Sequence, residues 1–175
     1  ALANAEEDAF INGTGTGQPL GILAETGGAQ VGVTTKSSGK VTADEVIDLV
    51  YSLKRPYRKN AVFLANDVCV AELRKLKDST GQYLRQPALH EGGFDTLLGK
   101  RIYTSPYAPE LAAGQKTVSF GDFSYYNIGD RGSRSIAELK ELFAGNGMVG
   151  FVAKERVDGK PVLPEAVKLL KMASA

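Results

Sequence analysis

The residues with the clearest chemical potential are the closely spaced glycines of Gly13–Leu23, read as Gly-Thr-Gly-Thr-Gly-Gln-Pro-Leu-Gly-Ile-Leu. Glycine-rich loops bind phosphate when they follow a strand and open a helix, and a P-loop also ends in a Lys-Ser/Thr pair. Here a helix-forming stretch precedes the glycines, Pro19 follows them and no lysine is present. The sequence therefore favours a structural loop with unusual backbone angles, and phosphate binding through Gly13–Gly17 is the minor alternative.

The single cysteine and the single histidine show no sign of forming a catalytic pair. Cys69 lies at helical spacing with Leu73 and Leu76, so we expect a thiol packed in the core and not a nucleophile. His90 falls in an irregular stretch, and no Gly-x-Ser-x-Gly motif is present. One cysteine also excludes an intrachain disulfide and a cysteine-based zinc site.

Carboxylates could form a metal site or an acid–base pair. The run Glu6-Glu7-Asp8 is consecutive within a helix-forming stretch, so its side chains should point to different faces instead of converging on one ion. Any two of the 20 acidic residues could meet in space, but no spacing singles out a pair. We therefore assign no catalytic, cofactor-binding or metal-binding residue, and we expect a protein that is not an enzyme and has no cofactor.

One basic group, Lys54, Arg55, Arg58 and Lys59, could contact nucleic acid. The favoured interpretation is that these charges match the C-terminus of the preceding helix and stay in water. With 21 basic against 20 acidic side chains, the net charge is +1. No large electrostatic field would therefore draw the chain to nucleic acid or to an anionic membrane.

The stretch Thr117–Arg131 is predicted to form the centre of a sheet. Val118 and Phe120 share one face of an extended run, Gly121 and Asp122 break it, and an aromatic-rich run resumes beyond the break. Two consecutive strands rich in aromatic and β-branched residues are typical of a sheet centre.

The segments before this stretch carry ordinary signals for helices and strands, which together predict an α+β domain with helices flanking a small sheet. In the N-terminal part we expect a helix over 1–11 ended by Asn12-Gly13, and then a surface loop over 25–40 that could contain a short strand. Next we expect a helix from the Thr42/Glu45 capping box to a stop at Pro56, a strand at Ala61–Ala65 buried on both faces, and a helix from the Asn66 cap to about Lys77. A turn at Asp78–Gly81, an irregular stretch over 82–94 and a strand within Leu97–Thr104 should follow.

The C-terminal part gives conflicting signals. Ser135–Phe143 begins with a capping box and has an apolar stripe, so local rules favour a helix there. Met148–Val157 is strand-like, and Asp158-Gly159 is a strong hairpin-turn signal. Val162–Leu170 returns as an extended or a helical end.

Four segments along the chain carry a family resemblance: Glu7–Leu23, Leu76–Leu84, Phe120–Arg131, and Glu155–Gly159 followed by Pro164–Ala166. In this order they resemble the HK97-type major capsid proteins of tailed phages. The first of them resembles the end of the long spine helix in that family.

This resemblance implies an HK97-like capsid fold in which an axial domain has a small central sheet flanked by helices. It divides the chain into a peripheral-domain remnant over 1–16, the axial domain over 17–131, a peripheral-domain excursion over 132–159 and a closing axial segment over 160–175. The excursion is extended in the family, so we expect strands in place of the helix at Ser135–Phe143, because tertiary pairing overrides local propensity.

The implied function is that of a structural subunit, here a fragment, of an icosahedral phage or prophage capsid. Its capsomers, pentamers and hexamers of the full-length protein, would enclose packaged DNA without reading its sequence and without a membrane. It would reside in the virion capsid after assembly in the bacterial cytoplasm. The N-terminal arm, the extended loop and most of the spine helix are absent from this sequence, so the fragment is expected to be a monomer or a weak oligomer.

Some members of the family cross-link covalently, joining a Lys on the extended loop to an Asn with help from a carboxylate. Asn146 and Glu155 do not match that spacing, so no catalytic residue is carried over.

Two alternatives stay open: the shell of an encapsulin-type bacterial compartment, and a small phosphate-binding enzyme that uses the Gly13–Gly17 loop. A nucleic-acid-binding module is a third option. A shell subunit spreads its function over broad surfaces, which agrees with the lack of a compact site.

Overall fold

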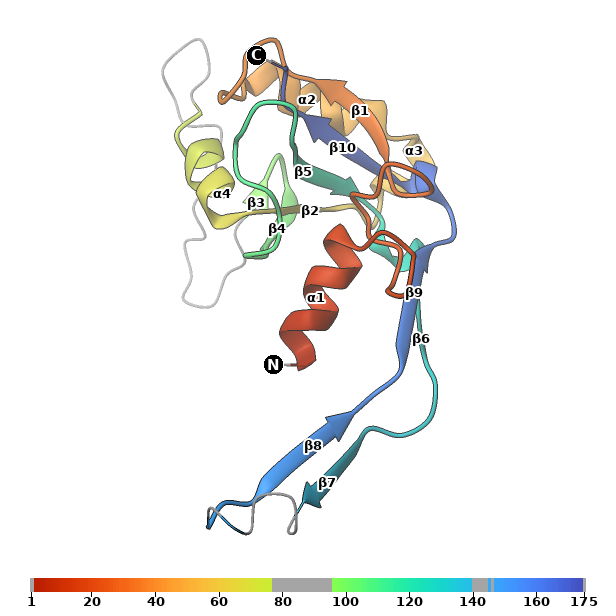
Figure 1. Cartoon of the computed structure of the whole chain (residues 1–175). Coiled ribbons are helices and arrows are strands. Elements are labelled where there is room, and N and C mark those ends of the chain that lie inside the picture. The colour runs from red at the N-terminus through yellow and green to blue at the C-terminus, as the bar shows by residue number, and fades with distance from the viewer. Residues whose placement is uncertain (1, 77–95, 140–144, 146, 175) are drawn as a thin grey trace.

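The computed structural model describes residues 2–76, 96–139, 145 and 147–174. An α+β body contains one mixed sheet, and a long two-stranded arm projects from it (Figure 1). The predicted α+β class is therefore confirmed. The turn at 78–81, the irregular stretch with His90, and Asn146 lie outside the described residues. The sheet has the strand order β1-β10-β5-β2-β4-β3, and its strands are β1 (Gln30–Thr34), β2 (Val62–Ala65), β3 (Thr96–Leu97), β4 (Lys100–Thr104), β5 (Lys116–Gly121) and β10 (Val167–Lys171).

Strand β5 lies at the centre of this sheet. It pairs antiparallel with β10 on one side and with β2 on the other, and all of its residues are buried. Phe63 of β2 lies opposite Phe120 of β5, and the two ring centroids are 4.4 Å apart. The prediction that Val118 and Phe120 belong to the sheet centre is confirmed.

The second strand of the predicted pair does not belong to this sheet. After β5, Asp122 caps a short 3-10 helix, η1 (Phe123–Tyr125), by accepting a hydrogen bond from the backbone N of Ser124 at 3.0 Å. Strand β6 (Tyr126–Asp130) then leaves the body and pairs with β9 (Val157–Pro161). The expectation of two adjacent central strands was wrong for β6, because the η1 turn redirects the chain out of the sheet.

Helix α2 (Ala43–Ser52) covers one face of the sheet with Val46 and Leu49. Its predicted capping box is confirmed: Thr42 Oγ1 accepts from Glu45 N at 3.4 Å, and Glu45 Oε2 accepts from Thr42 N at 2.8 Å. The predicted stop at Pro56 was wrong. The helix ends at Ser52, and Pro56 lies in the first turn of the short helix α3 (Arg55–Arg58), where proline's missing N–H is not needed.

Helix α4 (Asp67–Arg74) begins at the predicted Asn66 cap and buries Cys69, Val70 and Leu73. It ends three residues earlier than the predicted Lys77, at Arg74. Strand β2 is buried only on alternate residues: Phe63 and Ala65 are buried, while Val62 and Leu64 are half-buried. Burial on both faces was therefore a wrong expectation for the latter two.

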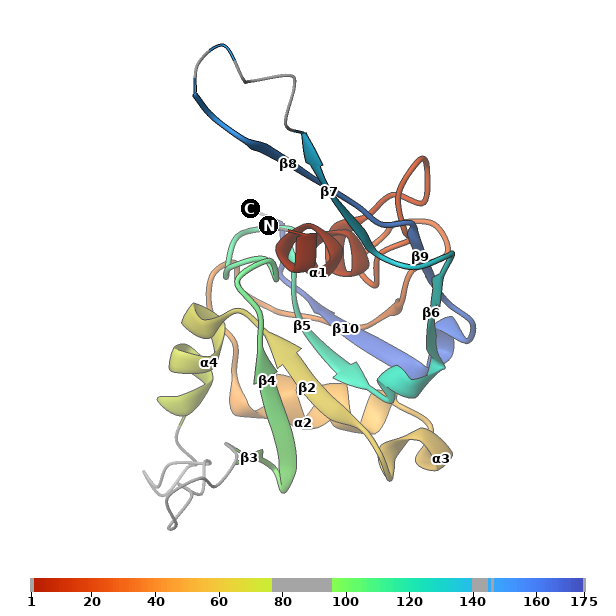
Figure 2. The same ribbon diagram turned by 90° about the horizontal axis from the view of Figure 1, so that it is seen from below.

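Two apolar clusters lie on opposite faces of the sheet, because alternate residues of β10 enter different clusters. In Figure 2 the sheet lies between helix α1 (Leu2–Asn12) in front and α2 behind. The larger cluster joins α2 and α4 to the sheet and includes Val46, Leu49, Leu53, Phe63, Cys69, Leu73, Val118, Phe120 and Leu170. The smaller cluster joins the loop after α1 to β10 and includes Ile22, Ala29, Val167 and Leu169.

The outer part of the arm is a second ribbon, formed by β7 (Ser135–Leu139) and β8 (Gly150–Lys154). The expected strand in place of a helix is confirmed over Ser135–Leu139, and residues 140–144 lie outside the described part. The hairpin turn expected at Asp158-Gly159 was wrong, because both residues lie inside β9. The closing segment, left open in the sequence, forms the 3-10 helix η3 (Pro164–Ala166) and then β10.

Candidate functional site: the arm and its junction with the body

The arm carries large apolar side chains that the body does not cover. Ile136 is 78% exposed and Phe151 is 72% exposed. A two-stranded ribbon also leaves backbone donors and acceptors unpaired along its edges. Exposed apolar residues gathered on one projecting element mark a contact surface, and we call this set the arm surface. Its members are Ile128, Ile136, Met148, Val149 and Phe151.

The base of the arm is packed against α1 by one aromatic contact. The rings of Phe10 and Tyr126 meet edge to face with centroids 5.8 Å apart. Tyr126 Oη donates to Leu20 O at 2.9 Å, and burial raises the pKa of this phenol to about 12. Gly159 lies beneath the Tyr126 ring, and a Cβ at this position would be 2.7 Å from Tyr126 Oη. Glycine is therefore present for close packing and not for a turn.

An ion cluster makes a second connection between α1 and the arm. Arg134 Nη2 lies 3.0 Å from Glu6 Oε1, and Arg134 Nε lies 2.9 Å from Glu155 Oε2. The side chains of Glu6 and Glu155 are only 17% and 11% exposed. Burial, together with the adjacent Glu6 carboxylate, raises the pKa of Glu155. One guanidinium thus holds two neighbouring carboxylates that would otherwise repel each other.

The glycine loop after α1 binds its own backbone. Gly13 N donates to Ala9 O at 2.9 Å, Gly15 N to Pro19 O at 3.2 Å and Gly21 N to Gly13 O at 2.8 Å. Gly15 and Gly17 have φ of 79° and 70°, so the predicted need for unusual backbone angles is confirmed. These three amides are directed at carbonyl groups, and they would have to be released before they could bind phosphate. Leu20 N also donates to Gly159 O at 2.7 Å, which joins the loop to the arm.

Cys69 is fully buried in α4, as expected of a packing thiol. Its Sγ lies 3.6 Å from Pro109 O. Burial raises the pKa of this thiol to about 11, so it is protonated at neutral pH and is a poor nucleophile.

The predicted divergence of the three consecutive acids of α1 is confirmed. Glu6 pairs with Arg134, Glu7 Oε1 accepts from Ser105 Oγ at 2.6 Å, and Asp8 Oδ1 accepts from Asn12 Nδ2 at 2.8 Å. Within the described ranges, no group of three or more His, Cys, Asp or Glu side chains is arranged to hold a metal ion. No helix among the same residues has the length and apolar character needed to cross a membrane.

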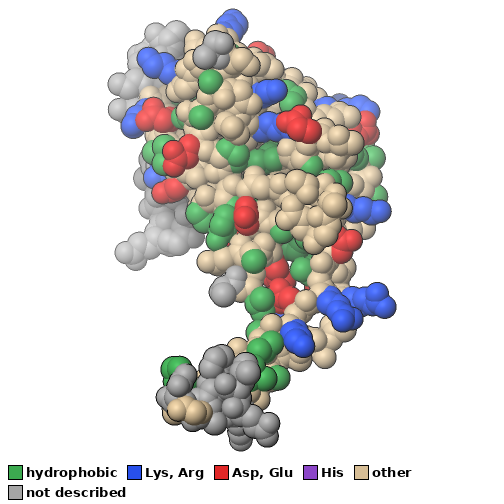
Figure 3. All heavy atoms as spheres, viewed as in Figure 1, with side chains coloured by type: hydrophobic (Ala, Val, Ile, Leu, Met, Phe, Trp, Pro, Cys, Tyr) green, Lys and Arg blue, Asp and Glu red, His purple; other side chains and the backbone are tan. Residues whose placement is uncertain are grey.

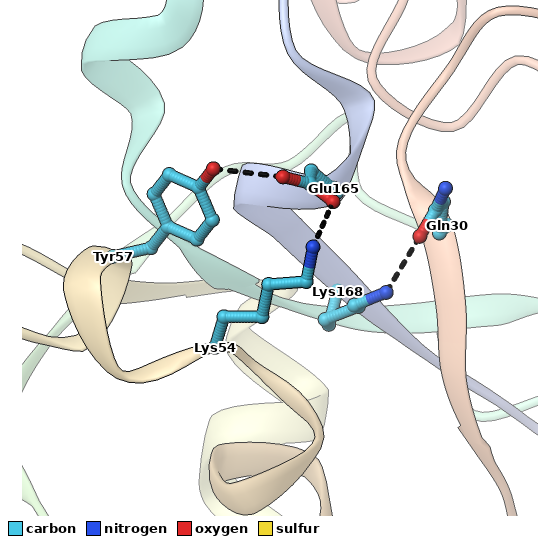
Figure 4. Close-up of polar contacts among 5 residues, drawn as sticks. All are labelled: Gln30, Lys54, Tyr57, Glu165 and Lys168. Carbon is cyan, nitrogen blue, oxygen red and sulfur yellow. Dashed lines mark hydrogen bonds and ion pairs between the residues drawn. The ribbon is translucent and has the colours of Figure 1, made fainter.

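Part of the basic group is used to hold the closing segment. In Figure 4, Lys54 and Tyr57 both point toward Glu165: Lys54 Nζ is 2.5 Å from Oε2, and Tyr57 Oη donates to Oε1 at 2.8 Å. These two contacts lower the pKa of Glu165. A neighbouring contact joins Lys168 Nζ to Gln30 Oε1 at 2.6 Å.

Arg58 acts on the end of the preceding helix. Its Nε donates to Leu53 O at 2.6 Å and its Nη2 to Tyr51 O at 2.8 Å. This agrees with the expected match between basic charge and a helix C-terminus.

The residues that sequence reasoning missed are Arg134, Tyr126 and the packing role of Gly159. No local signal could have joined them to α1, since Glu6 and Arg134 are 128 positions apart.

The fold is that of capsid and shell proteins. The chain has a TM-score of 0.84 and 34% identity to a structure titled "Capsid of empty GTA particle computed with C5 symmetry", over 99% of this chain and 63% of that chain. The native GTA particle gives a TM-score of 0.82 and 32% identity, over 99% of this chain and 62% of that one. At lower identity, which shows the fold alone, the holo-SrpI encapsulin complex of Synechococcus elongatus PCC 7942 gives a TM-score of 0.69 and 17% identity, over 97% of this chain and 61% of that one.

The model of the phage capsid family matches residues 1–172. The chain therefore belongs to the phage capsid family, and the resemblance inferred from the four sequence segments is confirmed. It spans about 63% and 62% of the two GTA capsid chains. The search of curated proteins gave no match.

Proposed function

We propose that this chain is part of a major capsid protein that associates with copies of itself into the capsomers of an icosahedral phage or prophage shell. The observation that carries the proposal is the match over 99% of the chain to a capsid solved with C5 symmetry. The arm surface supports it, because 78% and 72% exposure at Ile136 and Phe151 is unfavourable in water and is relieved when another surface covers these side chains.

The chain divides, in this proposal, into an axial part over 17–131 and 160–175 and a peripheral part over 1–16 and 132–159. The central sheet and its two apolar clusters support the axial part. Contacts of α1 with the arm support a joint peripheral part. Pentamers and hexamers of the whole protein would form the virion capsid around packaged DNA after assembly in the bacterial cytoplasm.

We also propose that the chain acts without catalysis. Two features support this: the carboxylates of α1 each bind a different partner, and the buried Cys69 thiol is kept protonated. A phosphate-binding enzyme that uses Gly13–Gly17 is disfavoured, because the amides of Gly13 and Gly15 donate to backbone carbonyls.

The test is electron microscopy of the complete gene product expressed in bacteria without other phage genes. Closed particles are expected, and an Ile136→Asp/Phe151→Asp variant should give dispersed subunits, because charged groups cannot be buried unpaired at an interface. Val68→Asp is the control, since Val68 is also exposed, at 49%, but lies on α4. Particles that form equally well with both arm substitutions would contradict the role of the arm surface, and dispersed wild-type subunits under all conditions would contradict the shell.

The encapsulin-type compartment is the alternative that the SrpI structure keeps open, on the basis of fold alone. The contents of the particles distinguish the two functions. Nuclease-protected DNA supports the phage shell, while a single enclosed protein and no DNA supports the compartment.

A further inference from the structure

A cationic hollow lies where the two ribbons of the arm meet. The β6–β9 register ends at the pair Asp130 and Val157, and the β7–β8 register begins at the pair Ser135 and Lys154. Residues 131–134 on one strand thus face the shorter segment 155–156 on the other. The longer segment bows out, with Gly132 at φ 83°, and leaves a hollow of about 240 Å³. Its lining residues are Arg131, Gly132, Ser133, Ser135, Lys154, Glu155 and Arg156.

Three of the residues that line this hollow are cations, namely Arg131, Lys154 and Arg156. Arg131 N donates to Arg156 O at 2.8 Å, which continues the β6–β9 register by one pair. Residues directly opposite in an antiparallel pair project to the same face, so the two arginines face each other across the strands. Lys154, the last residue of β8, lines the same hollow. Figure 3 shows basic side chains gathered at this narrow neck between body and arm.

Like charges directly opposite each other on a ribbon destabilise it. Among the described residues, the side chains of Arg131, Lys154 and Arg156 have no ion-pair partner, and all three are exposed. The carboxylate of Glu155 also lines the hollow, but it is held by Arg134 on the side that faces α1. Two further acids act on Glu155: Glu6, which Arg134 also holds, and Asp130. The folded chain therefore leaves an excess of positive charge here that an anion would neutralise.

We propose that this hollow is a binding site for a phosphate oxyanion, taken either as free phosphate or as the phosphodiester group of nucleic acid. Two guanidinium groups offer paired N–H donors that match tetrahedral oxyanions, and the hydroxyls of Ser133 and Ser135 add further donors to the lining. Free phosphate carries up to about two negative charges and at least three acceptor oxygens, against one charge and two oxygens for a carboxylate. A phosphodiester carries one charge, but neighbouring groups add theirs at about one negative charge per 1.7 Å of duplex axis. The excess of cations and donors therefore favours phosphate over an acidic side chain of a second copy. All the residues of this site lie in one chain, so phosphate binding is expected whether or not the chain assembles into a shell.

The test is mapping of amide chemical shifts of the chain on addition of inorganic phosphate, at constant ionic strength maintained with chloride. Saturable shifts confined to residues 131–135 and 154–156 are expected. Arg156→Gln should weaken phosphate binding at least about tenfold, because it removes a charge-assisted donor pair. Arg55→Gln is the matched control, since Arg55 is an exposed arginine on α3 far from the hollow. In chloride alone, Arg156→Gln should keep or raise the Tm, because one of two facing like charges is removed.

A short DNA duplex identifies the source of the phosphate. Shifts at the same amides with DNA assign the site to the nucleic acid backbone, and shifts with inorganic phosphate alone assign it to the free ion. The proposal is overturned if neither probe gives saturable shifts, or if Arg55→Gln weakens binding as much as Arg156→Gln. It is also overturned if these amides shift only with protein concentration, because a second copy's carboxylates would then be the partner.

Discussion

Arg134 Nη2 of the arm lies 3.0 Å from Glu6 Oε1 of helix α1, although the two residues are 128 positions apart. This ion pair joins the N-terminal helix to the two-stranded arm that projects from the body (Figure 1). The same guanidinium reaches Glu155 at 2.9 Å. Arg134 thus adds an ionic connection between α1 and the arm to the aromatic contact of Phe10 with Tyr126.

Replacing Arg134 by Met should loosen the first half of α1. The change keeps the aliphatic stem but removes both ion pairs and leaves Glu6 and Glu155 to repel each other. Amides of residues 2–8 should then exchange with solvent faster, as measured by hydrogen exchange and mass spectrometry. The drop in Tm should be small, because Arg134 is 64% exposed and water screens the pair. Arg55→Met is the control, and equal acceleration of α1 exchange in that variant would refute the assignment.

The raised pKa of Glu155 predicts that the junction weakens as pH rises. A free glutamate titrates near 4.5, and burial and Glu6 raise the folded-state pKa above that value, while Arg134 opposes the shift and Asp130 adds to it. The folded chain therefore binds this proton more tightly than the unfolded chain does. The resulting stability is fully present below pH 4.5 and is lost as pH rises through the raised pKa.

Thermal unfolding of Glu155→Gln and wild type across this range measures the effect. Gln mimics the protonated form, so the Tm of the variant relative to wild type should increase as pH rises from 4 toward 7. A constant difference would show that Glu155 titrates as an ordinary surface carboxylate, and a decreasing one that folding favours its ionised form; either result would contradict the raised pKa.

Gly159→Ala should destabilise the base of the arm. A Cβ at this position would be 2.7 Å from Tyr126 Oη and 3.1 Å from Phe10 Cε1, so the aromatic pair would have to move. Overpacking of this kind costs roughly 1–3 kcal/mol in the free energy of unfolding, measurable by urea denaturation. Gly129→Ala in the partner strand is the matched control, because a Cβ there meets no atom within 4 Å. Equal losses in the two variants would mean that strand propensity, not packing, explains the glycine.

Thr42→Ala should lower the free energy of unfolding by about 1 kcal/mol, because Glu45 N loses its side-chain acceptor at the start of α2. Thr42→Ser keeps the hydroxyl and should retain most of the stability. Urea denaturation of the three proteins measures the difference. If the serine variant were as unstable as the alanine variant, the methyl group and not the cap would be responsible.

Local signals predicted the body better than the arm. The Thr42/Glu45 capping box, the Asn66 cap and the burial of Cys69 all depend on residues within one or two helical turns. Asp158-Gly159 has the composition of a hairpin turn, yet both residues lie inside strand β9. The glycine is needed there because the ring of Tyr126, distant in sequence, packs against it. Ser135–Leu139 has the pattern of a helix but pairs with β8, and only the resemblance to capsid proteins indicated a strand.

The sequence by itself determined the α+β class, the starts of α2 and α4, the buried strand β5 and, through four short segments, membership of the capsid family. These features follow from contacts between residues close together in the chain, or from patterns that relatives share. Only the tertiary structure decided that β6 leaves the sheet, that Arg134 joins Glu6 to Glu155, and that Arg131 faces Arg156 across the arm. Those relationships depend on strand register, which pairs residues far apart in sequence and is set by the packing of the whole fold.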